Sequence, residues 1–89
     1  MRAFIYILRF KKSGKFYIGS TSDIKRRIRQ HKRKHTATTR RLGDFEVVFV
    51  KEINSLEKAR WAERKIKSWK RRDFIEKIVK DGKISFLER

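Results

Sequence analysis

The sequence predicts an α+β fold, a small three-stranded antiparallel sheet flanked by helices in the order ββαβαα. Three observations support this prediction: extended runs rich in β-branched and aromatic residues, helical stripes that follow capping residues, and a length of 89 residues with no proline. A chain of this length has room for one compact core, so we expect a single domain over residues 1–89.

The first two extended runs form a predicted hairpin. Residues 4–10 (FIYILRF) and 15–20 (KFYIGS) are extended runs, and residues 11–14 (KKSG) are a turn signal. A four-residue loop places Tyr6 opposite Gly19 and puts Tyr6 and Tyr17 on one face of the sheet. A glycine opposite a phenol predicts an open patch of backbone that another molecule could approach closely. Taken alone, the two tyrosines are also typical of half-buried strand residues.

A helix is expected over residues 23–35, because Thr21, Ser22 and Asp23 supply N-cap chemistry. Its stripe runs from Ile24 and Ile28 to two histidines. The histidine pair at i and i+4 is compatible with a zinc site, but no third ligand is nearby, so a phosphate contact for the first histidine is the favoured interpretation. Residues 36–43 (TATTRRLG) are expected to be a polar, flexible connection, and residues 45–53 (FEVVFVKEI) a third strand.

Two further helices are predicted from capping signatures. Asn54 with Glu57 three residues later is expected to open a helix that reaches about residue 69. Asp73 with Glu76 repeats the signature for a short last helix, which Gly82 ends. Two tryptophans, Trp61 and Trp69, are interpreted as packing residues, since stacking on a single strand would need them exposed.

One carboxylate stands out on the longer of these helices. Glu63 falls on the apolar stripe formed by Leu56, Ala59 and Ile66, where a buried unpaired charge costs several kcal/mol. Two interpretations remain open. The carboxylate forms an ion pair with a cation of its own helix (Arg60, Arg64 or Lys67), or it binds a metal ion.

The charge balance indicates the partner. The chain has 27 Lys and Arg against 10 Asp and Glu, a net charge of +17, which favours a nucleic acid over a membrane surface as partner. There are no cysteines, and the longest apolar run near the N-terminus, residues 4–8, is too short to span a membrane. We therefore expect a soluble cytoplasmic protein, nucleoid-associated if bacterial, without a membrane role.

In combination, these positions resemble the GIY-YIG nuclease family. The first half-motif is Phe4-Ile5-Tyr6 and the second is Tyr17-Ile18-Gly19, separated by the hairpin turn. An Arg followed four residues later by a His on the first helix matches Arg27 and His31. The single metal-binding Glu of the family, on a later helix, matches Glu63. The resemblance covers about residues 4–72 and is closest to the small stand-alone members.

The resemblance implies a site and a reaction. Tyr6 would be the general base, with Tyr17 sharing its proton, if Arg27 and the metal favour the phenolate. Arg27 and His31 would donate to phosphate oxygens, and Glu63 would bind Mg²⁺ or Mn²⁺. Residues expected to contact nucleic acid around this site are Lys15, Gly19, Ser20, Arg26 and His35.

The implied function is a Mg²⁺-dependent DNA endonuclease of the repair or recombination type, structure-selective or guided by a protein partner. No base-reading motif is evident in the sequence, so specificity is expected from DNA shape or from that partner. The alternative is a non-catalytic basic nucleic-acid-binding module or a degenerate nuclease, since small, basic, cysteine-free proteins are common in that class.

Overall fold

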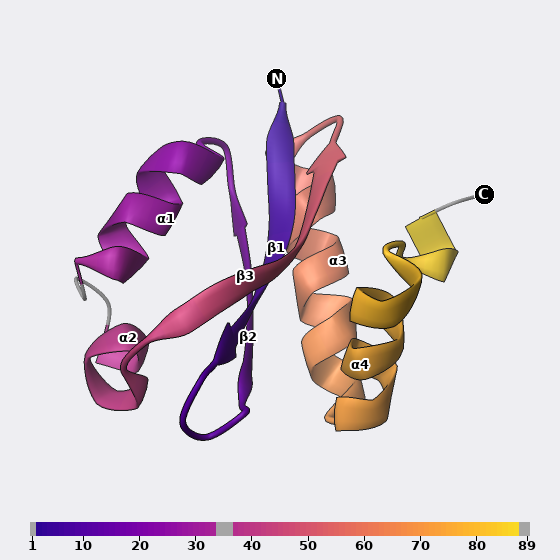
Figure 1. Cartoon of the computed structure of the whole chain (residues 1–89). Helices are drawn as coiled ribbons and strands as arrows, with labels where there is room; N and C mark the ends of the chain where they lie inside the picture. Colours follow the sequence, from indigo (N-terminus) through magenta and orange to yellow (C-terminus); the bar gives the residue numbers. More distant parts are fainter. Residues whose placement is uncertain (1, 34–36, 88–89) are drawn as a thin grey trace.

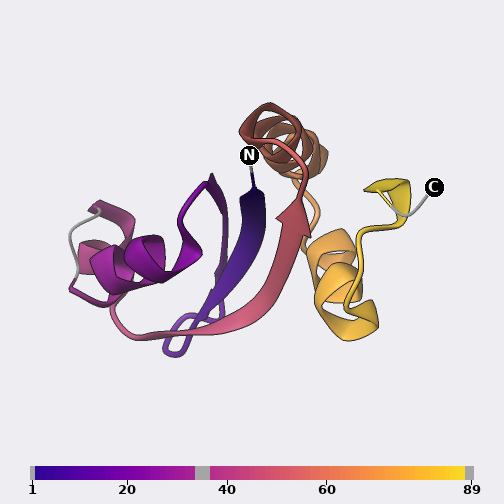
Figure 2. The same ribbon diagram turned by 90° about the horizontal axis from the view of Figure 1, so that it is seen from above.

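The computed structural model describes residues 2–33 and 37–87, and it arranges them in three layers. A twisted sheet lies in the middle, with helices α1 (Ile24–Lys32) and α2 (Ala37–Leu42) on one face (Figure 1). Helices α3 (Leu56–Trp69) and α4 (Arg72–Asp81) lie on the other face. The view from above shows the two groups of helices on opposite sides of the sheet (Figure 2). The predicted α+β class is therefore confirmed.

The sheet has the strand order β2-β1-β3 and is antiparallel throughout. Strand β1 (Ala3–Phe10) lies in the centre, between β2 (Phe16–Thr21) and β3 (Phe45–Ile53). The hairpin has the predicted register, with Tyr6 opposite Gly19 and Leu8 opposite Tyr17. Because paired residues share a face, both tyrosines point toward α1, while Ile5 and its partner Ser20 point toward α3.

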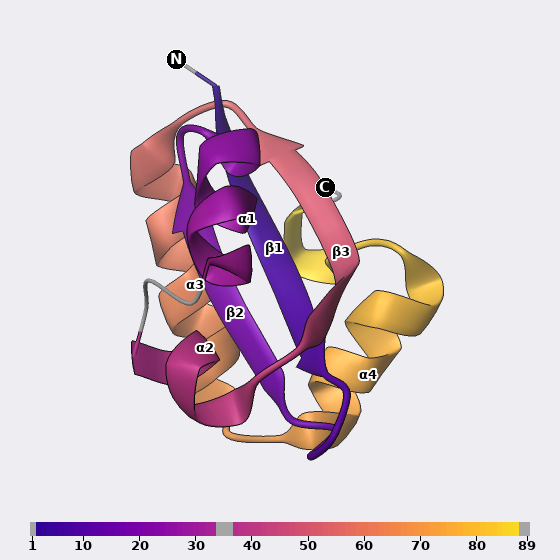
Figure 3. The same ribbon diagram turned by 60° about the vertical axis from the view of Figure 1, so that its left-hand side comes forward.

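Alternation along β1 separates two buried regions. Ile5 and Ile7 join the main apolar core, which α3 closes with Ala59, Ala62 and Ile66. On the opposite face Tyr6 and other side chains of β1 are also fully buried, beneath the first helix layer. Figure 3 shows α1 lying in front of β1 and β2, with α3 behind them. The central strand thus carries the core on one side and a buried phenol on the other.

Helix α1 begins as predicted, because the Asp23 carboxylate accepts a 3.1 Å hydrogen bond from the backbone N–H of Arg26. The expected flexible connection over residues 36–43 was wrong in part, since α2 occupies residues 37–42. Gly43, with φ of 81°, follows it, and its N–H bonds the carbonyl of Thr39. The order of the longer elements is the predicted ββαβαα, with this short helix added.

Two predicted caps differ from the structure. Helix α3 is capped by Ser55, whose hydroxyl accepts from the N–H of Lys58 at 3.1 Å, and not by the adjacent Asn54. Helix α4 begins after Arg71 without a side-chain cap, and Asp73 instead accepts two hydrogen bonds from the Arg71 guanidinium. At α3, a cap one residue later still bonds an otherwise unpaired backbone N–H of the first turn. The pattern therefore located the helix but not its capping residue.

The last helix ends at the predicted glycine, and a short 3₁₀ turn follows it. Gly82 terminates α4 in the left-handed region with φ of 69°, and a 3₁₀ turn η1 (Ser85–Leu87) packs back toward α3. No helix in the described part of the chain is long and apolar enough to cross a membrane.

Candidate active site

The hydroxyl of Tyr6 is the centre of the site. It lies 3.2 Å from Nε of Arg27 and 2.9 Å from Nε2 of His31, and the tyrosine has no exposed surface. The guanidinium can only donate, so the phenol oxygen accepts from Arg27. A second bond from Arg27, at 3.3 Å to the side-chain oxygen of Gln30, holds the guanidinium in place. The sequence analysis did not identify Gln30, because a glutamine three residues after an arginine on a basic helix is not a recognisable motif.

Burial controls protonation at this centre. It raises the pKa of Tyr6 to about 12, more than the Arg27 hydrogen bond lowers it. Burial, followed by the nearby Arg27 charge, lowers the pKa of His31 to about 4. Both groups are therefore neutral at pH 7, and one of them donates the hydrogen of the 2.9 Å bond between the Tyr6 hydroxyl and Nε2 of His31. Arg27 favours the Tyr6 phenolate, as expected, but burial outweighs its effect on this pKa in the free chain, and the contribution of a metal ion stays a prediction.

The position of His31 also corrects its predicted phosphate contact. The imidazole is fully buried, with ring centroids of Tyr17 at 5.2 Å, Tyr6 at 5.7 Å and Phe45 at 6.0 Å. A neutral ring enclosed by three aromatic side chains does not reach a phosphate at the surface. His31 therefore serves to orient Tyr6 from below.

Gly19 has a different use from the one predicted. A Cβ built on Gly19 would lie 2.5 Å from Cζ and 2.9 Å from Cε1 of Tyr6. The space beside Gly19 is thus filled by the Tyr6 phenol, and Gly19 itself is buried. The predicted open patch of backbone is absent at this point. A residue without a side chain is needed here because the ring of Tyr6, on the paired strand, occupies the space that a side chain would fill.

Tyr17 is the more accessible phenol of the site. It is partly exposed, its ring centroid lies 6.3 Å from that of Tyr6, and it contributes to the raised pKa of Arg27 after the larger contribution of Tyr6. The ammonium of Lys67 lies 5.6 Å from the Tyr17 ring centroid on the other side. Tyr17 therefore stands at the surface between two cations.

Glu63 approaches the same edge of the sheet from α3. Its Oε2 is 2.7 Å from Nζ of Lys67, and its Oε1 accepts a 2.5 Å hydrogen bond from the hydroxyl of Ser20. The ion-pair interpretation of this carboxylate is therefore present in the structure, with Lys67 as the cation. The side chain keeps 20% of its surface exposed and contributes, as the smallest of five causes, to the raised pKa of Tyr6. The carboxylate thus lies within electrostatic reach of the phenols, and Ser20 positions it.

A groove leads away from Tyr17 along β2 toward the end of α3 and the start of α4. Its volume is about 360 Å³, and half of its ten lining residues are cations, with no acid among them. Phe16, Ile18, Ile66 and Ile75 contribute the apolar surface, and Arg72 fixes one wall by donating to the carbonyl of Gly14 at 2.8 Å. We call it the basic groove; its cations are Lys15, Lys67, Lys70, Arg71 and Arg72.

Of the other predicted contact residues, one lies away from the phenols and one is outside the described part of the chain. Arg26 is exposed on α1 beside Arg29 and Arg33, next to Gln30 and not at the phenols. His35 falls outside the described residues, so the zinc interpretation that needs it stays a prediction. In the described part of the chain no three His, Cys, Asp or Glu side chains are close enough to hold a metal ion together.

Comparison with known proteins gives one family and one fold relative. The family model of the GIY-YIG catalytic domain matches residues 2–78. The UPF0213 protein BH0048 from Bacillus halodurans, solved in solution by NMR, is 34% identical and superposes with a TM-score of 0.57 over 90% of this chain and 84% of its own. No curated protein matches the chain significantly.

Proposed function

The chain belongs to the GIY-YIG catalytic domain family, and on this basis we propose that it is a Mg²⁺-dependent endonuclease that hydrolyses phosphodiester bonds in DNA. Nuclease-type chemistry follows from the family. The metal, the DNA substrate and the roles of single residues are our proposal. The observation that carries it is the Arg27 guanidinium held between two phenols, with the Glu63 carboxylate within electrostatic reach of Tyr6 and with Tyr17 lining a groove that has five cations.

Arg27 is the proposed phosphate-binding group. A guanidinium has five N–H donors, and the hydrogen bonds to Tyr6 and Gln30 use two of them. The remaining donors suit the non-bridging oxygens of a phosphodiester, where negative charge grows during hydrolysis. Tyr6 and His31 hold the guanidinium from beneath, so both are positioning residues in this proposal.

Tyr17 takes the role of general base that the sequence suggested for Tyr6. The base must reach a water molecule in line with the phosphate. Tyr6 has no exposed surface and its hydroxyl is bonded on two sides, whereas Tyr17 is partly exposed between Arg27 and Lys67. Two cations, Arg27 and Lys67, thus flank the side chain that would take the proton of the attacking water.

Glu63 is the proposed metal ligand. Its carboxylate is partly exposed beside the phenols, and the cation that occupies it, Lys67, is 47% exposed and can swing away along its four-carbon chain. A single carboxylate fits Mg²⁺, which keeps several waters and completes its shell with substrate phosphate. The bound ion would neutralise charge on the phosphate. Lys67 released from Glu63 stays in the basic groove, where it can meet the substrate backbone.

The proposed substrate is DNA recognised by shape. Cations line the groove and no base-reading motif is present, so we propose structure-selective cutting in repair or recombination, or cutting guided by a protein partner, in the cytoplasm.

The test compares two acidic residues of α3. Glu63→Gln should abolish Mg²⁺-dependent cleavage of branched, nicked and duplex DNA while affinity in chelator stays within about twofold of the parent. Glu57→Gln, which changes an exposed acid in the first turn of the same helix, should cleave DNA like the parent. Cleavage retained by Glu63→Gln would remove the metal role of this residue.

One observation favours a second candidate, a degenerate nuclease that binds nucleic acid without cutting it. The pair of Glu63 with Lys67 and Ser20 satisfies both carboxylate oxygens without a metal. Binding to every substrate, with no cleavage at any Mg²⁺ or Mn²⁺ concentration, would select this function.

A further inference from the structure

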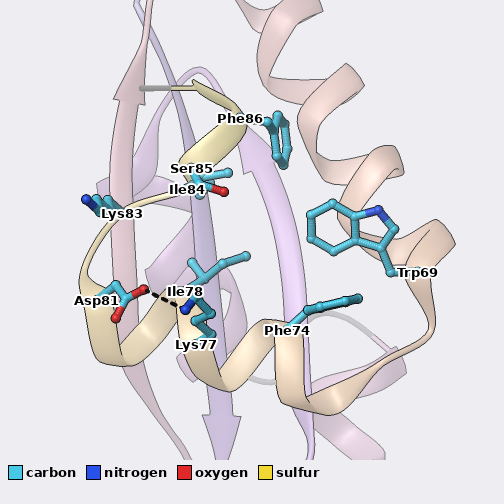
Figure 4. Close-up of a pocket in the computed structure, with 9 residues that line it drawn as sticks. All are labelled: Trp69, Phe74, Lys77, Ile78, Asp81, Lys83, Ile84, Ser85 and Phe86. Carbon is cyan, nitrogen blue, oxygen red and sulfur yellow. Dashed lines mark ion pairs between the residues drawn. The ribbon is translucent and has the colours of Figure 1, made fainter. Parts of the chain in front are cut away.

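A second groove lies on the side of the sheet away from Tyr17. It has a volume of about 360 Å³ and is formed where the end of α3, α4 and η1 meet. Its apolar lining consists of Trp69, Phe74, Ile78, Ile84 and Phe86, and we call it the aromatic groove. Figure 4 shows the three aromatic side chains on one side of Ile78 and Ile84, with Asp81 and Lys83 on the other.

The rings of this groove are arranged edge to face around Trp69. The centroid of Trp69 lies 5.2 Å from Phe74 and 5.6 Å from Phe86, and both pairs are close to perpendicular. Trp61 extends the row, 5.6 Å from Phe86. Edge-to-face pairs leave some ring faces without an aromatic partner. The Arg71 guanidinium covers one face of Phe74, so a flat ligand would use a face of Trp69.

These aromatic side chains are exposed in a chain that exposes few large apolar groups. Phe74 keeps 38% of its surface exposed and Trp61 44%, and only two valines among the described residues are comparable. Trp61 packs against Phe86, as the sequence interpretation held, but nearly half of its surface also faces solvent. In a chain with 42% charged residues, an apolar recess of this size is typical of a binding site.

Positive charge surrounds the aromatic groove. The ammonium of Lys65 lies 5.2 Å from the Trp61 ring and 5.3 Å from Phe86, and the Arg71 guanidinium lies 4.5 Å over Phe74. Lys83 lines the groove as well. Its one acidic lining residue, Asp81, is 4.0 Å from the ammonium of Lys77, so little negative charge is left uncompensated.

The aromatic groove adjoins the basic groove at Arg71. Arg71 lines the basic groove and at the same time covers Phe74, which lines the aromatic one. A strand whose phosphates follow the basic groove away from Tyr17 would reach Arg71, and from there an unpaired base has an apolar recess next to it.

We propose that the aromatic groove binds an unpaired nucleobase of a single strand, which stacks on Trp69 with its edge against Phe74, with the adjacent phosphates on Arg71 and Lys83. This inference rests on the proposed binding of nucleic acid, and it identifies single-stranded segments, such as the flap of a branched substrate, as what the protein recognises. Base stacking on aromatic side chains accepts any base, in agreement with a chain that has no base-reading motif. A second copy of the chain is a poor occupant, because each copy carries a charge of +17.

The two tryptophans provide the probe. In Trp61→Phe, the remaining indole is Trp69, which lines the aromatic groove, so its fluorescence reports on this site alone. Titration with oligothymidylate in excess chelator should quench Trp69 at the concentrations that saturate the anisotropy of a labelled copy of the oligonucleotide. A closed duplex hairpin should bind without quenching. Saturated single-strand binding without quenching, or equal quenching by the hairpin, would overturn the proposal.

A second measurement uses substitutions at the groove. Phe74→Leu keeps the apolar volume but removes the aromatic ring, and should weaken single-strand binding at least about fivefold while duplex binding is unchanged. Val47→Ala, at an exposed apolar residue of β3, should bind like the parent. Lys83→Gln should lower the salt slope for the single strand by about 0.7, whether or not the first variant folds. Unchanged binding by both groove variants would contradict the proposal.

Two outcomes separate this proposal from the proposed enzyme. Because the titration is done in chelator, quenching without any cleavage in Mg²⁺ would support the groove and remove the nuclease. Cleavage in Mg²⁺ without quenching would support the nuclease and refute the aromatic groove as a base site. Quenching that rises with protein concentration in the absence of oligonucleotide, with a dimer in sedimentation, would assign the groove to a second copy and refute it as a base site.

Discussion

Gly19→Ala should destabilise the protein strongly, although alanine is normally preferred to glycine in a strand. The new Cβ would lie 2.5 Å from Cζ of Tyr6, whereas ordinary contacts begin near 3.4 Å, so the phenol must move by roughly 1 Å. That displacement takes its hydroxyl out of hydrogen-bonding range of both His31, now at 2.9 Å, and Arg27, now at 3.2 Å.

The magnitude follows from these two bonds. A bond to a neutral partner contributes about 1 kcal/mol and one to a charged partner about 2 kcal/mol, so we expect a loss of about 3 kcal/mol, before any strain in the surrounding layer. For a domain of this size, that loss lowers Tm by about 12 to 24 °C. Thermal unfolding followed by circular dichroism measures it. An unchanged Tm would refute the packing of Tyr6 against Gly19.

A double-mutant cycle isolates the contact. In the Tyr6→Leu background the phenol is gone, so adding Gly19→Ala should cost less than about 0.5 kcal/mol or stabilise the strand. Equal cost in both backgrounds would show that the penalty comes from the strand itself and not from the tyrosine.

Three further predictions concern pH, catalysis and substrate binding. Because burial lowers the pKa of His31 to about 4, the unfolded chain binds a proton that the folded chain refuses, and the free energy of unfolding should fall by about 3 kcal/mol as pH drops from 6.5 to 4. Urea unfolding of the parent and of His31→Gln measures this loss as a difference in slope, and parallel pH profiles would contradict it. Tyr17→Phe should lower the cleavage rate by at least about a hundredfold with substrate affinity unchanged, as single-turnover kinetics would show; a rate near that of the parent would exclude Tyr17 as base. Lys15→Gln with Lys70→Gln should reduce the slope of log affinity against log salt on duplex DNA by about 2, whereas Lys58→Gln, an exposed cation outside the basic groove, should leave it unchanged; equal slopes for both variants would refute the groove as the backbone path.

Local sequence rules located the main elements and the hairpin register. The four-residue turn and strict alternation of β1 place Tyr6 opposite Gly19, and this pairing is observed. The same rules failed where two neighbouring residues offer equivalent chemistry, as with Asn54 and Ser55 at the start of α3, and where a polar segment gains a short helix, as at α2. Small differences in free energy decide these cases, and local patterns do not resolve them.

The candidate site shows the same division. The resemblance to the GIY-YIG family singled out Tyr6, Tyr17, Arg27 and His31, and the fold brings these four side chains together. The sequence did not reveal that Tyr6 and His31 are buried and neutral, because their burial depends on how α1 packs on the sheet. The ion pair of Glu63 was established only by its 2.7 Å distance to Lys67, and the metal role of the same carboxylate stays a prediction.

The order of residues along the chain therefore determined which side chains share a face, since pleat and helical repeat act over a few residues and are independent of the rest of the fold. Only the tertiary structure decided what each of these groups touches. Whether a phenol meets water or a buried imidazole, and whether Trp69 and Phe74 close a core or line a groove, depends on the packing of elements distant in sequence. Solvation sets the charge of such groups, and solvation is a property of the assembled layers.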